Sequence, residues 1–397
     1  LMTLRNKKTK AFGRHNDYKS LAFTLYKIAY EFSKKKEKGK SGSIISQITD
    51  LIFDNKGLSW KNKIKLKQSS ISQAFKSSIL DLIGGLRKEK HESTDSRINF
   101  TYEKIADVCD EYFKGVIKSL EKDLAKGDFF KVIRNVSSSI PGIFLAIPFF
   151  STLKHMYKNR DLLQEIRKAF GVMPAKNKKK VLWFSDTIND LNGVSVTVEK
   201  IRETAENSKK NIVIVGCENT KHEVSNFINL PQIYNFSLPY YESLSIKIPS
   251  FLKSLEIIQK EQPDEIIIST PGPIGLLGLF VSILFNIKAT GIYHTDFSTQ
   301  VKNIKNDDDL TTLVDIYTNW FYQQVDEIRV PSQAYIDILG DKGIKREKMK
   351  IFKRGLDIEL FSPKKYARQF IQNNFNLTEG DFFLYAGRIS KDKDIDV

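Results

Sequence analysis

The spacing of apolar residues changes near residue 181. Before that point apolar residues recur at helical spacing, and no stretch alternates convincingly with a period of two. The clearest predicted helices in this part are residues 18–38, ISQAFKSSILDLIGGL and YEKIADVCDEYFKGVIKSLEKDL. After it, short runs rich in β-branched residues alternate with helical stretches. The pattern therefore predicts a mainly helical part followed by an α/β part.

Six short apolar runs predict the strands of the second part. They are VLWFS, NIVIVG, EIIIS, ATGIYH, DEIRV and MKIFK, and predicted helices such as VSVTVEKIRETAE and IPSFLKSLEIIQKEQ separate most of them. Such alternation implies right-handed crossovers and a parallel sheet covered on both faces. Nearly continuous apolar strands agree with burial of both faces. We predict a doubly wound, Rossmann-like α/β domain over residues 179–362, preceded by a mainly helical region over residues 1–178.

Polar residues follow five of the predicted strands. In open parallel sheets, ligands bind beyond the carboxyl ends of the strands, where loops and helix amino termini present free N–H groups. We therefore expect the five loops to converge on one edge of the sheet and to form a cleft. The candidate binding residues in these loops are Asp186, Asn192, Gly193, Thr270, Gly272, His294, Thr295, Asp296, Ser332, Arg354 and Gly355.

Several common site motifs are missing from these loops. The turn after the first strand lacks a full G-x-G-x-x-G, which argues against a tightly bound dinucleotide. The sequence contains no P-loop, and no nucleophile elbow surrounds Ser332, so hydrolase chemistry is not favoured. Gly193 still leaves room for a phosphate or a sugar against the backbone, at the positive end of the following helix.

The positive charge of the chain is concentrated in its first part. Residues 1–180 hold 38 Lys and Arg against 18 Asp and Glu, which leaves 25 against 29 for residues 181–397. This excess favours an anionic surface, either lipid headgroups or a polyanion, with a solvated lysine-rich surface as the alternative. Nucleic acid is not favoured, because the lysines lack the interleaved aromatic and glycine pattern of a stacking platform.

The segment SSSIPGIFLAIPFFSTLKHM, residues 137–156, is the most apolar of the chain. Its uncharged run is shorter than the roughly 20 residues that a bilayer requires, and Pro141 and Pro148 interrupt it. Two interpretations stay open. The segment forms a buried hairpin, or it dips into a membrane interface beside its flanking basic residues.

Metal and disulfide chemistry have little support in the sequence. Cys109 and Cys217 are best interpreted as two small buried residues in a reducing compartment. His15, His91 and His155 lie far apart along the chain, whereas a metal needs three or four converging ligands. The run of acids from residue 307 to 309 is typical of a solvated loop and helix cap. We expect no dedicated metal site.

Six motifs of the second part, taken in order, resemble the family 4 retaining glycosyltransferases of the GT-B architecture. They are FSDTINDLNGVSVTVEKI, PDEIIISTPGPIGLLGL, GIYHTDF, WFYQQVDEIRVPSQAY, FKRGLDIELFSP and YAGRISKDK, and they cover roughly residues 181–397. Within the family, the members that act on glycolipid or phospholipid acceptors look most similar.

The resemblance implies two facing Rossmann-like domains, the first holding a lipid or glycan acceptor and the second a nucleotide sugar. Residues 363–397 would begin the second domain. Gly193 would lie against the donor phosphate or sugar, His294 near the transferred sugar, and Arg388 with Lys393 would neutralise the leaving diphosphate. No cofactor is implied besides the nucleotide-sugar substrate. The protein would be cytoplasmic, and peripheral on the inner face of the membrane.

The chain also departs from the family pattern. The second domain of the family continues with further strand–helix units and a pair of glutamates, whereas the sequence stops at Val397. The resemblance therefore implies an enzyme truncated at its carboxyl end, whose 397 residues alone are inactive. One alternative is a non-catalytic sugar-binding or acceptor-binding module. Another is a fusion in which residues 1–175 end an upstream metal-dependent phosphoesterase.

Overall fold

A computed structural model describes the conformation of part of the chain. The described residues are 94–126, 154, 160–171, 179–190, 192–219, 225–238, 241–305, 307–352, 359, 361–362, 367–375, 385 and 387. The predicted helices at 18–38 and 71–86 lie outside them, as does the apolar segment at 137–156 apart from residue 154. So do the candidate residues His15, His91, His155, Arg354, Gly355, Arg388 and Lys393.

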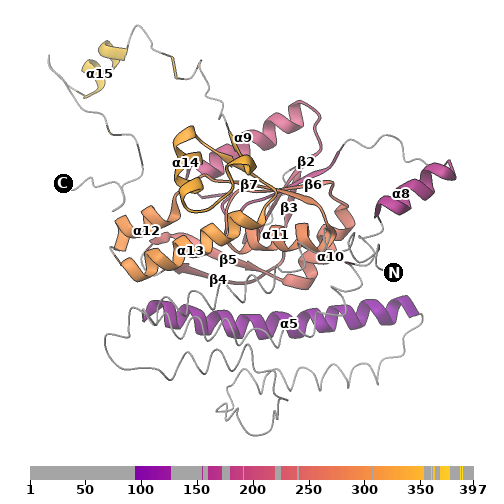
Figure 1. The fold of residues 1–397 in the computed structure, drawn as a ribbon. Helices are drawn as coiled ribbons and strands as arrows, with labels where there is room; N and C mark the ends of the chain where they lie inside the picture. Colours follow the sequence, from indigo (N-terminus) through magenta and orange to yellow (C-terminus); the bar gives the residue numbers. More distant parts are fainter. Residues whose placement is uncertain are drawn as a thin grey trace.

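Seven strands form one sheet at the centre of the α/β body (Figure 1). Their order is β3-β2-β1-β6-β7-β8-β9, and every neighbouring pair is parallel. Their bounds are β1 Val181–Phe184, β2 Ile212–Gly216, β3 Phe227–Asn229, β6 Glu265–Ile268, β7 Lys288–Ile292, β8 Glu327–Val330 and β9 Met349–Ile351. All six predicted strands are present, and the parallel, doubly wound sheet is confirmed.

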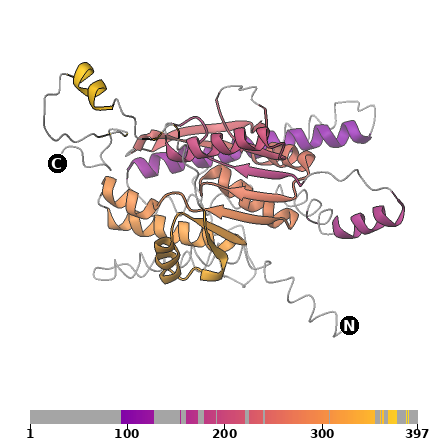
Figure 2. The same cartoon turned by 90° about the horizontal axis from the view of Figure 1, so that it is seen from above.

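Helices follow the strands as the sequence pattern predicts. They are α9 Gly193–Asn207, α10 Phe251–Glu261, α11 Pro273–Phe285, α12 Phe297–Lys305, α13 Asp308–Gln324, α14 Gln333–Asp341 and the short 3-10 helix η2 Arg346–Lys348. Figure 2 shows helices on both sides of the strands. Asp307 caps α13, since its Oδ1 accepts a hydrogen bond of 3.0 Å from the Leu310 N–H. That prediction from the acidic run is confirmed.

Successive strand residues point to opposite faces, so the sheet separates two apolar clusters. Leu182 and Phe184 of β1 belong to a large cluster with residues of α10, α11 and α13. Trp183 points the other way and packs in a smaller cluster with Val198 of α9. Burial on both faces explains why the strands carry nearly continuous apolar residues.

A separate antiparallel hairpin was not predicted. It consists of β4 Gln232–Leu238 and β5 Tyr241–Pro249. Its register shifts twice, at Gln232/Tyr234 and at Ser237/Leu238. The sequence does alternate here, because single polar residues separate the apolar residues of each strand: Tyr234, Phe236 and Leu238 in β4, and Leu244, Ile246 and Ile248 in β5. This signal of a hairpin was overlooked. The three-residue strand β3 was missed as well, because so short a run carries no period.

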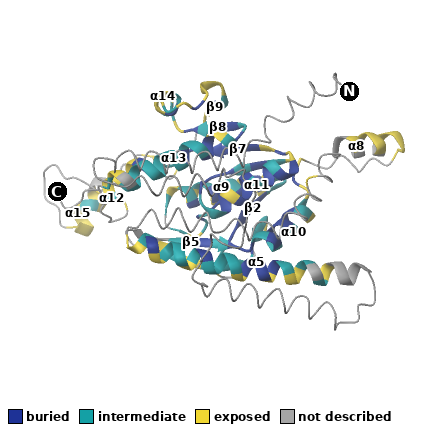
Figure 3. Cartoon of the chain, turned by 60° about the horizontal axis from the view of Figure 1, so that its bottom comes forward, coloured by how far each residue is buried: buried dark blue, intermediate teal, exposed yellow. Residues whose placement is uncertain are grey.

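A 32-residue helix, α5 (Thr94–Ala125), packs along the α/β body beneath the hairpin (Figures 1 and 3). Ala106 and Cys109 are fully buried in the large apolar cluster. The Tyr102 hydroxyl donates to the Leu252 carbonyl over 2.6 Å, and the Ser250 hydroxyl donates to Asp110 over 2.8 Å. This helix, although it precedes residue 178, therefore shares its core with the α/β domain.

Two further helices lie apart from the sheet in Figures 1 and 2, namely α8 Arg160–Ala169 and α15 Ala367–Phe375. Leu162, Ile166 and Phe170 on and just after α8 expose large apolar side chains. None of the described helices combines the length and apolar character needed to cross a bilayer. Both cysteines are buried and free, as expected.

Candidate functional site at the carboxyl edge of the sheet

The carboxyl ends of β1, β6, β7 and β8 lie side by side, because these strands are neighbours and parallel. The loops that follow them carry most of the predicted site residues, so the described part of the predicted edge is confirmed. The chain winds outward from β1 in one direction through β2 and β3, and from β6 in the other through β9. This reversal between β1 and β6 is the place where doubly wound folds open a crevice.

Asp186 follows β1 at this reversal and holds the start of α11. Its carboxylate accepts hydrogen bonds from the Thr270 hydroxyl over 2.6 Å and from the backbone N–H groups of Gly272, Ile274 and Gly275 over 2.7 to 3.2 Å. Burial raises the pKa of Asp186, and these hydrogen bonds oppose the rise. The geometry gives Asp186 the role of a helix cap that joins β1 to α11.

The glycines at the start of α11 are required by this cap. A Cβ at Gly272 would lie 2.5 Å from the Asp186 Cγ, and one at Gly275 would lie 1.7 Å from the Thr270 carbonyl oxygen. Thr270 is itself buried and hydrogen-bonded to Asp186. Packing within the chain thus accounts for Thr270, Gly272 and Gly275 without any ligand.

Gly193 differs from those glycines. It is exposed at the first position of α9, and a Cβ placed on it would meet nothing within 4 Å. The preceding residue, Asn192, caps the helix, because its Oδ1 accepts hydrogen bonds of 2.9 Å from the N–H groups of Val194 and Ser195. The space beside Gly193 is therefore open to a molecule that approaches the backbone closely.

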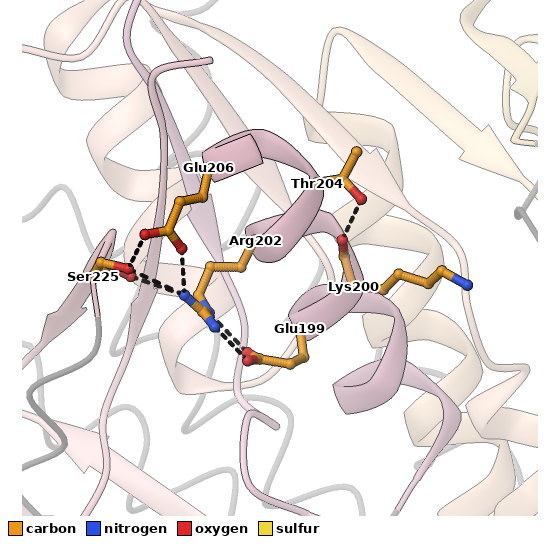
Figure 4. Close-up of polar contacts among 6 residues, drawn as sticks. All are labelled: Glu199, Lys200, Arg202, Thr204, Glu206 and Ser225. Carbon is orange, nitrogen blue, oxygen red and sulfur yellow. Dashed lines mark hydrogen bonds and ion pairs between the residues drawn. The ribbon is translucent and has the colours of Figure 1, made fainter. Parts of the chain in front are cut away.

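The far end of α9 is anchored to the turn before β3 (Figure 4). Arg202 is 12% exposed and pairs with Glu199 over 2.6 Å and with Glu206 over 3.3 Å. It also donates to the Ser225 carbonyl over 3.2 Å. The pairs with Glu199 and Glu206 lie within α9, and the contact to Ser225 joins the helix to the turn before β3.

His294, Thr295 and Asp296 follow β7 and are each partly exposed. The His294 ring meets the Phe352 ring, which follows β9, edge to face at 6.5 Å. Asp296 accepts from the Ser298 hydroxyl over 2.8 Å and from the Thr299 hydroxyl over 2.9 Å. Burial alone would raise the pKa of Asp296, but these hydrogen bonds outweigh it and the pKa lies below its usual range. Asp296 thus caps α12 and places His294 at the edge.

Ser332 lies at the start of α14 with no side-chain capping bond, at the carboxyl end of β8. The four other candidates in the loops and beyond, Arg354, Gly355, Arg388 and Lys393, lie outside the described residues. Within the described ranges, no group of three or more His, Cys, Asp or Glu side chains is arranged to hold a metal ion.

Sequence reasoning missed four polar residues near the ends of β1 and β2. Thr187 and Asp190 follow β1, Glu218 follows β2, and Lys247 lies on β5. Glu218 comes two residues after a predicted strand, so the rule applied to the other loops would have identified it. Lys247 gave no such signal, because the hairpin that carries it was not predicted.

The seven-stranded parallel sheet and its covering helices define a Rossmann-like α/β domain. Residues 191–360 match the sequence profile of Glycosyltransferase Family 4. The chain therefore contains a domain of Glycosyltransferase Family 4, in agreement with the resemblance found from its motifs.

The other comparisons add less. None of the curated proteins matches the chain significantly. Among seven matching solved chains is Anabaena HepE in complex with UDP-glucose, which is 14% identical and has a TM-score of 0.35. The match covers 50% of this chain and 50% of that one, so the chain spans about half the length of this solved relative.

Proposed function

We propose that the protein is a retaining glycosyltransferase that moves a sugar from a nucleotide-sugar donor to a hydroxyl group of an acceptor. The observation that carries the proposal is the match of residues 191–360 to Glycosyltransferase Family 4. The parallel sheet supports it, because loops at the carboxyl ends of β1, β7 and β8 lie on one edge with partly exposed polar residues.

Two described residues are proposed to act on the donor. Gly193 would lie against a donor phosphate or sugar, since the space around its Cα is open and α9 begins there. His294 would lie near the transferred sugar, since it ends β7 at the same edge. Arg388 and Lys393, or Lys391 in its place, would carry the leaving diphosphate, because fixed cations stabilise the negative charge that develops on departure.

The acceptor is proposed to be a lipid or a glycan, with the protein peripheral on the cytoplasmic face of a membrane. Two observations support a membrane surface. Residues 1–180 carry 38 Lys and Arg against 18 Asp and Glu. The helix α8 exposes Leu162 and Ile166, and Phe170 just after it is 79% exposed. Basic residues and exposed apolar side chains on one helix suit an anionic lipid interface.

Turnover tests the proposal most directly. Protein produced from the native gene is incubated with a panel of UDP-, GDP- and ADP-sugars, with and without lipid extract, and release of nucleoside diphosphate is measured. We expect acceptor-dependent release with one donor. His294→Ala should lower it by about 100-fold or more, because an edge residue near the reacting sugar acts mainly in the transition state. Lys200→Ala, at an exposed position of α9, serves as the control.

The two other outcomes are informative. Acceptor binding without turnover for any donor would favour the non-catalytic binding module. Turnover that is unchanged in His294→Ala would assign His294 to the scaffold.

Vesicle flotation tests the membrane part separately. Binding should rise with the fraction of anionic lipid and fall with salt, because the attraction is screened over about 8–10 Å at ordinary ionic strength. Equal binding to neutral vesicles would contradict the electrostatic role of the basic part.

A further inference from the structure

A second polar group lies beside the predicted site, where the loop after β1 covers the end of β2. Ile188 packs over Gly216, since a Cβ at Gly216 would lie only 2.0 Å from the Ile188 Cδ1. This close approach places the loop that carries Thr187 and Asp190 against the end of β2, two residues before Glu218. The arrangement depends on Gly216, the last residue of β2.

The centre of this group is a buried ion pair. Lys247 Nζ of β5 lies 2.7 Å from Glu218 Oε2, and the two side chains are 8% and 6% exposed. Asp190 follows Ile188 by two residues in the same loop, and burial raises the pKa of Asp190 while Lys247 lowers it and Glu218 raises it. The group therefore combines two carboxyl groups with one ammonium group, and it carries no excess of positive charge.

Three side-chain oxygens of this group are buried without a hydrogen-bond partner. They are Glu218 Oε1, Asp190 Oδ2 and Thr187 Oγ1. Thr187 is 7% exposed, so water in bulk does not reach it freely. Buried polar atoms without partners are rare and costly in native proteins, so each needs a partner of matching chemistry.

The chemistry of the three atoms restricts that partner. The carboxylate oxygens accept hydrogen bonds, and the Thr187 hydroxyl both donates and accepts. The Lys247 ammonium group has three N–H donors, one of which donates to Glu218. A ligand with neighbouring hydroxyl groups offers donors to the carboxylates and acceptors to the ammonium group. A phosphate or carboxylate offers only acceptors and would meet two acidic side chains.

We propose that Asp190, Glu218 and Lys247, with Thr187, form a subsite for an uncharged, hydroxyl-rich ring of the glycosyl acceptor. This inference rests on the proposed function and on the expectation, from the family resemblance, that the first Rossmann-like domain holds the acceptor. It adds two points to that function. The group recognised here is a sugar or cyclic polyol without a phosphate, and the residues named above recognise it.

The subsite is remote from the proposed reaction centre. The strand β2 is separated from β7, which carries His294, by β1 and β6. Three strand spacings of about 4.8 Å correspond to about 14 Å, which exceeds the width of one sugar ring. The ring held at Glu218 is therefore a positioning ring, and the reacting hydroxyl belongs to another part of the acceptor. Binding energy from such a remote group serves to orient the reacting part.

Saturation-transfer NMR on the 397-residue chain tests the subsite. The probes are the neutral methyl glucoside, methyl mannoside, methyl galactoside and myo-inositol, and the anionic glucose 6-phosphate and glucuronate, all at millimolar concentration. We expect at least one neutral probe to bind and the anionic probes not to bind. Glu218→Gln and Lys247→Met should weaken that binding about tenfold or more, since each removes a charged hydrogen-bonding group.

Two further variants separate recognition from folding. Asp190→Asn is the second test, because the side chain of Asp190 is only half-buried and its substitution leaves the Lys247–Glu218 pair intact. Glu203→Gln, an isosteric change on the exposed face of α9, is the control and should bind like the wild type. Thermal unfolding of each variant shows whether it is folded.

Three results would overturn the subsite: no neutral probe binds the wild type, only the anionic probes bind, or Asp190→Asn and Glu218→Gln bind as the wild type does. The last result would assign the buried oxygens to ordered water. Donor turnover by the wild type without any polyol binding would leave the glycosyltransferase proposal standing and remove the subsite. Polyol binding at Glu218 and Lys247 without turnover for any donor would support the subsite and contradict the glycosyltransferase proposal.

Discussion

The two edges of the central sheet use polar residues in opposite ways. At the amino edge, opposite charges pair across adjacent strands. Lys288 of β7 lies 4.0 Å from Glu265 of β6 and 3.3 Å from Glu327 of β8, and Lys350 of β9 lies 3.0 Å from Glu327. Lys179, just before β1, pairs with Glu265 as well. These charges satisfy one another.

At the carboxyl edge, some polar groups are fully hydrogen-bonded within the fold, whereas others have atoms without a hydrogen-bond partner. The Asp186 carboxylate is occupied by four donors of the chain. Glu218 Oε1 and Asp190 Oδ2 are buried without a partner, and Gly193 faces open space. The comparison teaches that position at a ligand-binding edge does not by itself make a residue a ligand-binding residue. Whether a residue is free to bind a ligand depends on the hydrogen bonds that its atoms already make within the chain.

The largest effect on stability is expected at Asp186, although it lies at the carboxyl edge. Asp186→Ala would leave several buried donors at the start of α11 without an acceptor. We expect the free energy of unfolding to fall by about 3–5 kcal/mol, because each unsatisfied buried donor costs about 1–3 kcal/mol before relaxation. Chemical denaturation measures it, with Asp190→Asn as the control. A loss below that of the control would contradict the capping role.

The second largest difference in stability is expected between two glycine variants at the same edge. Gly275→Ala forces a Cβ to 1.7 Å from the Thr270 carbonyl oxygen, whereas Gly193→Ala meets nothing within 4 Å. We expect Gly275→Ala to destabilise the protein by about 2–3 kcal/mol and Gly193→Ala to change stability by less than about 0.5 kcal/mol. If Gly193 lies against the donor, Gly193→Ala should still reduce turnover. Equal unfolding midpoints for the two variants would remove the distinction.

At the amino edge, Glu327→Gln should cost about 1–2 kcal/mol at neutral pH, because its partners Lys288 and Lys350 are half-exposed and can be hydrated once the pair is lost. Burial alone would raise the pKa of Glu327, but hydrogen bonds from Lys350 and Lys288 outweigh it and the pKa is lowered.

A lowered pKa of a carboxyl group stabilises the fold above the unfolded-state pKa of about 4.3. This contribution is lost as pH falls through the folded-state value. The wild type should therefore lose stability in acid more steeply than Glu327→Gln, as measured by unfolding from neutral pH to below pH 4. Parallel pH profiles would show that Glu327 contributes nothing through its charge.

The smallest effect is expected at the anchor of α9. Arg202→Ala removes the contacts to Glu199, Glu206 and Ser225. Because both glutamates are about half exposed, we expect a loss of about 1 kcal/mol. Lys200→Ala, on an exposed position of the same helix, is the control. Thermal unfolding of both variants measures the difference, and a midpoint equal to that of the control would show that the anchor is not stabilising.

Much of the fold and part of the site could be predicted from the sequence. The six strands of the sheet carry β-branched residues with little interruption, and the helices between them show clear periodicity. The polar residues after β1, β6, β7 and β8 were found by their positions alone. The hairpin β4–β5 was missed although its apolar residues alternate with polar ones, as in the run from Leu244 to Ile248. Lys247, which lies on this hairpin, was therefore missed, and so was its ion pair with Glu218.

Local sequence by itself determined the strands, the helices, the parallel sheet and the edge at which polar residues gather, because periodicity and the order of elements act over short distances along the chain. Only the tertiary structure decided which of those residues are free to meet a ligand. Asp186 meets its donors 84 to 89 residues later in the chain, and Lys247 meets Glu218 across 29 residues. Hydrogen bonds between distant segments depend on packing, and no local pattern encodes them.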